Sequence, residues 1–196
     1  MKGLLVTALT AALVVGGVYL LEAKDDPAGA APGQVGSVPT APESGTSPRD
    51  RLLHASAQEL GITPARGVWG VLMERGYAKG VATIVALTDG TASMYLSTGG
   101  AGVVGSSYAP ARLAAQKLCE QGADSLRETA PTHDFRPPAK GRVRFYVLTT
   151  DGVHVAEDDI LAPAKDGGPD RLAPLLAAGD AVIEQLKDAT SKGLIR

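Results

Sequence analysis

The chain contains the stretch VATIVALTDGTASMYLS, from Val81 to Ser97, and a second stretch of the same design, RVRFYVLTTDGVHVAE, from Arg142 to Glu157. Each consists of two apolar runs separated by an Asp-Gly pair, Asp89-Gly90 in the first and Asp151-Gly152 in the second. Asp-Gly between such runs is typical of tight hairpin turns, because glycine readily adopts positive φ. The sequence therefore predicts two antiparallel β-hairpins.

The side-chain patterns of these runs indicate where each strand lies in a sheet. Val81–Leu87 is almost wholly apolar, which is typical of a central strand covered on both faces. In the next run, Met94 and Leu96 alternate with polar residues, so we expect Ser93–Thr98 to form a half-exposed strand at an edge. Arg142–Val147 alternates in the same way.

Four other segments carry helical signals, either a proline at the first helical position or apolar residues at helical spacing. Helices are predicted at Ser47–Leu60, Thr63–Gly76, Pro110–Glu128 and Pro174–Gly193. The second prediction rests on Thr63-Pro64 as a start signal and on an apolar face formed by Val68, Trp69, Leu72 and Met73.

The predicted order is two helices, a hairpin, a helix, a second hairpin and a last helix. One antiparallel sheet with helices packed on it would bury every apolar stripe, which predicts an α/β protein of the α+β class. Over residues 65–192, this order resembles the roadblock/longin-like group of profilin-like architectures. The resemblance implies a profilin-like fold; the familiar members of that group regulate GTPases in the cytosol, partners that an exported domain would not have.

The N-terminal segment is strongly apolar. Gly3–Leu21 carries no charge, and as a helix it would span roughly 28 Å, close to the thickness of a bilayer core. We therefore predict a signal anchor over residues 1–24. A cleaved signal peptide is the alternative, with Ala28-Gly29-Ala30 as its best cleavage site. Lys2 precedes the apolar run and acidic residues follow it, so the domain is expected outside the cytoplasm. After cleavage it would be secreted or periplasmic.

Residues 25–46 are rich in Pro, Gly, Ala and Ser, and Val35 and Val38 are their only branched apolar residues. Such a segment buries too little surface to offset its ordering entropy, so it is predicted to be a disordered linker. The globular domain is then residues 47–196. That part of the chain has 17 basic and 17 acidic residues, a neutral balance that argues against nucleic-acid binding.

The clearest candidate site is a glycine-rich loop between a strand and a helix. Gly100, Gly102 and Gly105 have the G-x-G-x-x-G spacing of a phosphate cradle. The acidic residue expected about 20 residues further on is missing, so a loop that needs positive φ or close backbone packing is the competing interpretation. In either case, the candidate ligand or partner contacts are Gly99, Gly100, Gly102, Gly105, Ser106 and Ser107.

Other reactive residue types do not form a recognisable catalytic set. Cys119 is the only cysteine and lies within an apolar helical stripe, as expected for a core residue. The three histidines have no metal-ligand spacing, and the acidic run Glu157–Asp159 is predicted to be solvated. We therefore expect no catalytic residue, no metal and no cofactor.

The sequence favours a membrane-tethered, non-catalytic domain for protein–protein interaction at the cell envelope. It would contact the membrane through residues 3–21, and a protein partner or a second copy through an edge strand. The alternative is a small-molecule or nucleotide-binding domain, or an enzyme, that uses the loop 99–107.

Overall fold

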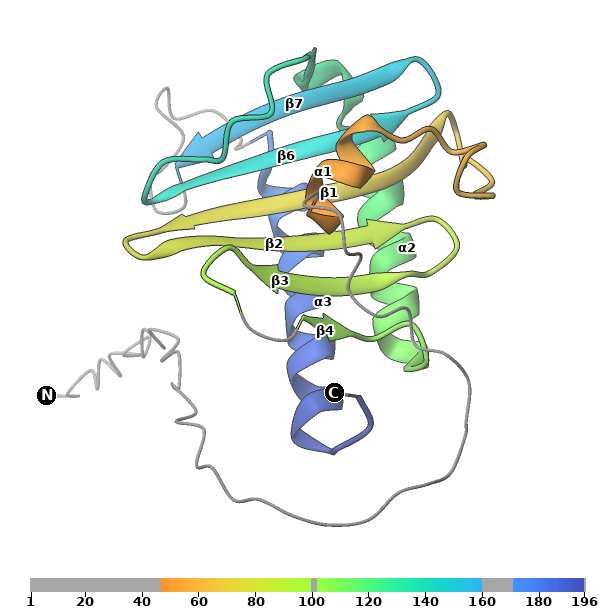
Figure 1. Cartoon of the computed structure of the whole chain (residues 1–196). Helices are drawn as coiled ribbons and strands as arrows, with labels where there is room; N and C mark the ends of the chain where they lie inside the picture. The colour runs from red at the N-terminus through yellow and green to blue at the C-terminus, as the bar shows by residue number, and fades with distance from the viewer. Residues whose placement is uncertain (1–46, 100–101, 160–170, 196) are drawn as a thin grey trace, which may run out of the picture. The chain divides into compact units, whose positions relative to one another are not determined.

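The computed structural model describes residues 47–99, 102–159 and 171–195, which form a seven-stranded antiparallel sheet and three α-helices (Figure 1). The expected α+β class and the antiparallel sheet are thus confirmed. The strands are β1 (Val68–Tyr77), β2 (Gly80–Leu87), β3 (Ala92–Leu96), β4 (Val103–Val104), β5 (Ala130–Pro131), β6 (Arg142–Thr149) and β7 (Gly152–Asp159). The helices are α1 (Pro48–His54), α2 (Ala109–Asp124) and α3 (Ala173–Ser191), with a 3₁₀ turn, η1, at Leu126–Glu128.

The strand order is β4-β3-β2-β1-β6-β7-β5. Both predicted hairpins are present, β2–β3 and β6–β7, and each turns at its Asp-Gly pair. At the first turn Gly90 has a φ of 91°, and the Thr91 amide donates to Asp89 Oδ1 at 2.8 Å. The Asp-Gly pair therefore forms the tight turn that the sequence predicts, with glycine at positive φ and an Asp side chain that accepts a backbone amide.

The predicted helix at Thr63–Gly76 is wrong, because this segment contains β1, the strand that joins the two hairpins. Both faces of β1 are covered, so Val71 and Met73 are buried on one side and Leu72 on the other. A strand covered on both faces has apolar residues at consecutive positions, which imitate a helical stripe in a short window.

The chain enters β1 through a tight turn rather than a helix start. Arg66 and Gly67 have φ values of 54° and 81°, and Ala65 and Val68 exchange backbone hydrogen bonds. The first predicted helix is also shorter than expected, since α1 ends at His54 rather than near Leu60.

The strand expected at the edge, Ser93–Thr98, corresponds to β3, which is the second strand from the edge. The two-residue strand β4 pairs outside it, at Ser93 and Met94. The pattern predicted that the polar residues of this strand face solvent and the apolar ones face the core. In the structure Ser93 is 2% exposed and Leu96 is 51% exposed, which is the reverse. The position of a strand in the sheet order follows from long-range pairing, which alternation within the strand does not encode.

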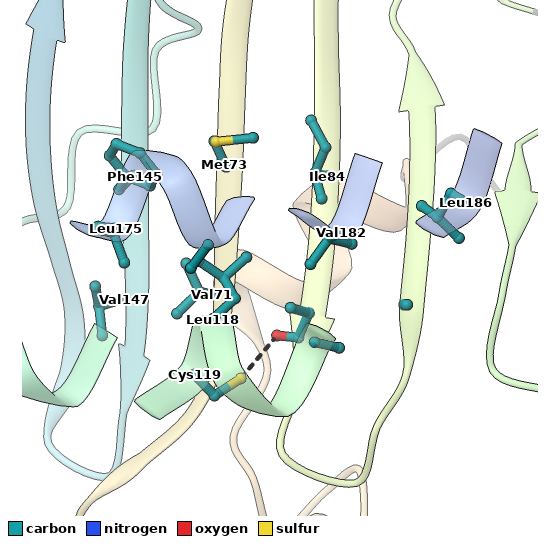
Figure 2. Close-up of a cluster of buried hydrophobic side chains, with 14 of the residues drawn as sticks. Val71, Met73, Ile84, Leu118, Cys119, Phe145, Val147, Leu175, Val182 and Leu186 are labelled. Atoms are coloured by element: carbon teal, nitrogen blue, oxygen red, sulfur yellow. Dashed lines mark hydrogen bonds between the residues drawn. The ribbon is translucent and has the colours of Figure 1, made fainter. Parts of the chain in front are cut away.

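Two helices, α2 and α3, cover one face of the sheet and enclose the main core (Figures 1 and 2). Both helices were expected, with α2 ending at Asp124 and η1 continuing the chain to Glu128. Figure 2 shows Leu118 of α2 and Leu175, Val182 and Leu186 of α3 directed at strand residues. With only two phenylalanines in the chain, aliphatic side chains supply most of this core.

The other face of the sheet is covered by α1 and by loops. A second buried cluster lies there, made of Leu53, Ala57, Ile62, Trp69, Leu72, Val85, Leu87, Tyr146 and Leu148. In contrast to the long helices on the opposite face, α1 has only seven residues and buries one of them completely, Leu53. This face therefore carries the surface features described below.

The proposed anchor and linker lie outside the described residues. Within 47–99, 102–159 and 171–195, no helix has both the length and the apolar character needed to cross a bilayer.

Candidate functional site

The glycine-rich loop is explained in large part by packing. A Cβ on Gly102 would stand 2.5 Å from the Tyr95 ring, and a Cβ on Gly105 would collide with Leu186 of α3. The Gly105 amide also donates to the Ala92 carbonyl at 2.8 Å, which attaches the loop to β3. Gly99 has a φ of 89°, a conformation that favours glycine. Three of the four predicted glycines therefore have a structural role.

The other predicted residues of this loop contribute less. Gly100 lies outside the described residues. Ser106 is partly exposed and Ser107 is exposed, and both precede Tyr108, the N-cap residue of α2, which makes no capping bond through its side chain. The Tyr108 hydroxyl instead donates to Asp188 of α3 at 2.7 Å. A ligand role for Ser106 and Ser107 stays a prediction.

The Cys119 thiol lies in the core between α2 and the sheet, as Figure 2 shows. Its side chain is 3% exposed, and Sγ donates to the Ala86 carbonyl at 3.4 Å. Burial, aided by the negative charge of Asp89, raises the pKa of this thiol to about 12. A neutral, enclosed thiol is a poor nucleophile.

The structure brings two of the three histidines together. His54 and His133 line a hollow of about 230 Å³ whose walls include Trp69 and Phe135. His54 contacts Phe135 edge-on, with 5.1 Å between ring centroids. His154 lies elsewhere, with Nδ1 3.1 Å from the Thr129 hydroxyl. In the described part of the chain, no group of three or more His, Cys, Asp or Glu side chains could hold a metal ion.

The acidic run Glu157–Asp159 is not a solvated segment, contrary to expectation. It is the end of β7, and the side chains of Glu157 and Asp159 pair with arginines of β6. Glu157 accepts hydrogen bonds from Arg142 Nε at 3.1 Å and from Arg144 Nε at 2.7 Å, and Asp159 accepts one from Arg142. The run was misread because its arginine partners lie on the opposite strand of the hairpin.

A polar group missed by sequence analysis lies at the centre of the sheet. Glu74 of β1 is fully buried, and Arg49 of α1 binds it with Nε on Oε1 and Nη2 on Oε2 at 3.0 Å. The Thr83 hydroxyl adds a third donor at 3.0 Å. Burial alone would lower the pKa of Arg49, but the hydrogen bond and the charge of Glu74 raise it overall. This pair holds α1 on the sheet.

The same group continues across neighbouring strands. Tyr95, Thr83, Glu74, Arg144 and Glu157 are successive partners in register, one from each of β3, β2, β1, β6 and β7. Arg49 Nη2 also donates to the Phe135 carbonyl at 2.7 Å. Within this row, Glu74 accepts hydrogen bonds from Thr83 and Arg49, and Arg144 pairs with Glu157, so each of its three charges has a partner.

Between α1 and strands β2 and β3 lies an open groove of about 740 Å³, which we call the α1 groove. Val85 and Leu87 lie at its bottom and are almost wholly buried, whereas Leu52 and Tyr95 line it and are partly exposed. The rim is charged and comes from α1 and the residues that follow it, with Asp50, Arg51 and Glu59. A groove with an apolar floor and a charged rim suits a polypeptide better than a metal or a free phosphate.

Two exposed apolar residues extend the surface of this groove. Leu60 lines it and is 37% exposed. Val104 is 47% exposed and pairs in register with Ser93, another lining residue. Sequence analysis missed the groove because its floor residues come from two strands and its rim from a helix more than thirty residues earlier. Hydrophobic pattern alone could have identified Val85 and Leu87 only as core residues.

Comparison with known proteins adds no assignment: no family model, no curated protein and no solved structure matches this chain. The functional conclusion therefore depends on the site itself.

Proposed function

We propose that this chain is a membrane-tethered, non-catalytic domain that binds another protein at the cell envelope, and that the α1 groove is its contact surface. The observation that carries the proposal is the apolar floor of the groove. Among the residues that line it, Leu52 and Tyr95 are partly exposed and Leu60 is 37% exposed, on the sheet face that lacks the long helices. Contiguous exposed apolar surface with a polar rim is typical of interaction sites.

The geometry favours a protein partner over a small molecule. Small-molecule sites enclose most of their ligand, with a few convergent polar groups. The α1 groove is open, and its apolar surface continues outward to Leu60 and Val104. The Arg49–Glu74 pair holds α1, one wall of the groove, against the sheet, so this wall is preorganised.

Placement at the envelope is supported by the sequence of the N-terminal segment. Residues 3–21 would anchor the chain, and residues 25–46 would let the domain stand away from the bilayer. We also propose a distant relation to the roadblock/longin-like architectures. The order helix, strands, helix, strands, helix supports it, although four strands (β1 to β4) rather than one hairpin precede α2 along the chain.

Pairing of an edge strand with a second copy or a peptide is a second candidate. Its support is the short length of β4, which leaves Tyr95 and Leu96 of β3 without an outer strand partner in the described residues. The small-molecule alternative rests on the partly exposed Ser106 and the exposed Ser107. A thermal-shift panel of nucleotides, sugars and acyl phosphates distinguishes it from protein binding, since a protein-binding domain should not respond.

The test uses a photo-crosslinking amino acid at Thr91, inside the α1 groove, in the full-length chain expressed in its own cells. The control places it at Glu120, an exposed position on α2. A discrete protein adduct at Thr91, absent at Glu120 and lost when Leu60→Asp is added at the exposed edge of the groove, is the expected result. No adduct, or the same adducts at both positions, would contradict the proposal. Circular dichroism should show that the Leu60→Asp variant keeps its fold, because Leu60 is exposed.

A further inference from the structure

We infer that the partner bound in the α1 groove is a second copy of this chain, arranged about a two-fold axis so that Arg51 of each copy pairs with Glu59 of the other. The inference rests on the proposed function in taking the groove as the contact surface. It adds the identity of the partner and the side chains that join the two copies, and it can fail while the groove remains the contact surface.

The first argument is charge on the rim of the groove. Arg51 is exposed, and its side chain forms no ion pair or hydrogen bond with any residue that the structure describes. Glu59 is also exposed, and the only donor to its carboxylate in the described part of the chain is Ser56, through its amide at 2.7 Å and its hydroxyl at 2.9 Å. Asp50, in contrast, already pairs with Arg49 at 3.2 Å. The rim therefore offers a partner one positive and one negative charge.

Glu59 is ionised at neutral pH. The hydrogen bond from the Ser56 amide, followed by the one from its hydroxyl, lowers the pKa of Glu59. Neither donor carries a charge, so the carboxylate keeps its negative charge uncompensated. An arginine of a second copy would supply the missing positive charge.

The second argument is the position of the apolar side chains. Each of the two charged residues is followed in sequence by an apolar residue that also lines the groove. Leu52 follows Arg51 and is partly exposed, and Leu60 follows Glu59 and is 37% exposed. Tyr95 lines the same groove and is partly exposed. Tyrosine is enriched at the centres of protein interfaces, because its ring is apolar and its hydroxyl can still bind.

A surface with these components can be complementary to itself. In a two-fold dimer, a contact between one residue of the first copy and another residue of the second occurs twice, with the two residues exchanged. A pairing of Arg51 with Glu59 would therefore form two ion pairs in one interface, and the neighbouring Leu52 and Leu60 would meet across the axis. A partner with charges of only one sign would leave one of the two rim charges unpaired.

The test measures the dissociation constant of the dimer by sedimentation equilibrium of the full-length chain in density-matched detergent. We expect Arg51→Glu and Glu59→Arg each to raise this constant by at least about tenfold, because two attractive pairs become two repulsive ones. The double variant Arg51→Glu/Glu59→Arg should restore the original value, since it exchanges the charges. Both residues are exposed, so the variants should keep the fold, and the fluorescence of the buried Trp69 checks this.

A mixing experiment tests the two-fold arrangement itself. Affinity-tagged Arg51→Glu should recover untagged Glu59→Arg, because both contacts of the mixed dimer again join an acidic to a basic side chain. It should not recover untagged Arg51→Glu. Recovery of both untagged variants in equal amounts would overturn the inference.

Two controls make the same changes of net charge on α2, which covers the opposite face of the sheet (Figure 1). Lys117 and Glu120 are exposed and form their own pair at 2.9 Å. Lys117→Glu and Glu120→Arg should leave the dissociation constant of the dimer unchanged. If they weaken the dimer as much as the rim variants do, the effect is one of net charge and the inference fails.

Two further outcomes would overturn the inference: a chain that sediments as a monomer at every concentration, and a dimer that the rim variants do not weaken. The photo-adduct at Thr91 separates the inference from the proposed function. It should have twice the mass of the chain. An adduct of a different mass would refute the second copy and leave the groove as the contact surface, whereas the absence of any adduct would refute the proposed function.

Discussion

Replacement of Arg49 by methionine should destabilise the domain through Glu74. The substitution keeps the length of the aliphatic stem and removes both guanidinium bonds to a carboxylate that is 0% exposed, leaving Thr83 as its only side-chain donor. Breaking a buried ion pair by removing one partner typically costs 3–5 kcal/mol. Because the Arg49 side chain is 20% exposed, water can partly replace it, so we expect about 3 kcal/mol.

The measurement is equilibrium unfolding in urea, followed by tryptophan fluorescence. Trp69 is the only tryptophan in the chain, is 1% exposed and donates its indole N–H to the Thr149 carbonyl at 3.2 Å, so it reports on the core beneath α1. For a domain of this size, about 3 kcal/mol corresponds to a fall in Tm of roughly 6–12 °C.

Two variants distinguish a buried unpaired charge from a general loss of α1 packing. The double variant Arg49→Met/Glu74→Met should recover most of the stability, because an apolar pair can replace a buried ion pair at little cost. Arg66→Met breaks an exposed pair with Asp124 and should cost less than about 1 kcal/mol. The reasoning is refuted if Arg49→Met is no worse than Arg66→Met, or if the double variant is as unstable as Arg49→Met alone.

Three further outcomes are expected. Gly105→Val should lower the free energy of unfolding by about 1–3 kcal/mol, because its side chain would collide with Leu186; an unchanged urea midpoint would contradict this packing. Cys119 should resist alkylation at pH 8 in the folded chain and react with the reagent in urea. The pKa of this thiol in the folded chain, about 12, exceeds the ordinary thiol value, so the free energy of unfolding should fall as the pH rises above about 9. The hydrogen bonds from Lys192 and Tyr108 lower the pKa of Asp188. The stability that the ionised Asp188 contributes is therefore present above about pH 4 and is lost as the pH falls. Asp188→Asn should reduce the dependence of the urea midpoint on acid pH.

The two hairpins and the two long helices were predictable because their signals are local. Asp89-Gly90 and Asp151-Gly152 specify turns by their own backbone preferences, and α3 has an apolar stripe that ends before Gly193. The class of the fold follows from these elements. The same local reasoning failed at β1, because consecutive apolar residues arise both on one face of a helix and on the two faces of a buried strand.

The candidate site was less accessible to sequence analysis. The glycine spacing indicated a loop in which there is no room for a Cβ atom. The side chains that occupy this room are Tyr95 on β3 and Leu186 on α3, which local sequence could not identify. Glu74 gave no signal of its own, since its partner Arg49 lies 25 residues earlier. If Val68–Tyr77 had been recognised as a strand, the alternation of side chains would have placed Glu74 on the same face as Leu72 and so predicted a buried charge.

Composition, turn chemistry and hydrophobic periodicity were enough to establish the α+β class, the hairpins, the neutral domain and the core position of Cys119, because each depends on residues close together in the chain. The order of the strands, the burial of Glu74 under α1 and the α1 groove depend on which distant segments come into contact. Those contacts are determined by the packing of the whole sheet, because the free energy gained by burying a sheet face exceeds the secondary-structure propensity of any single segment.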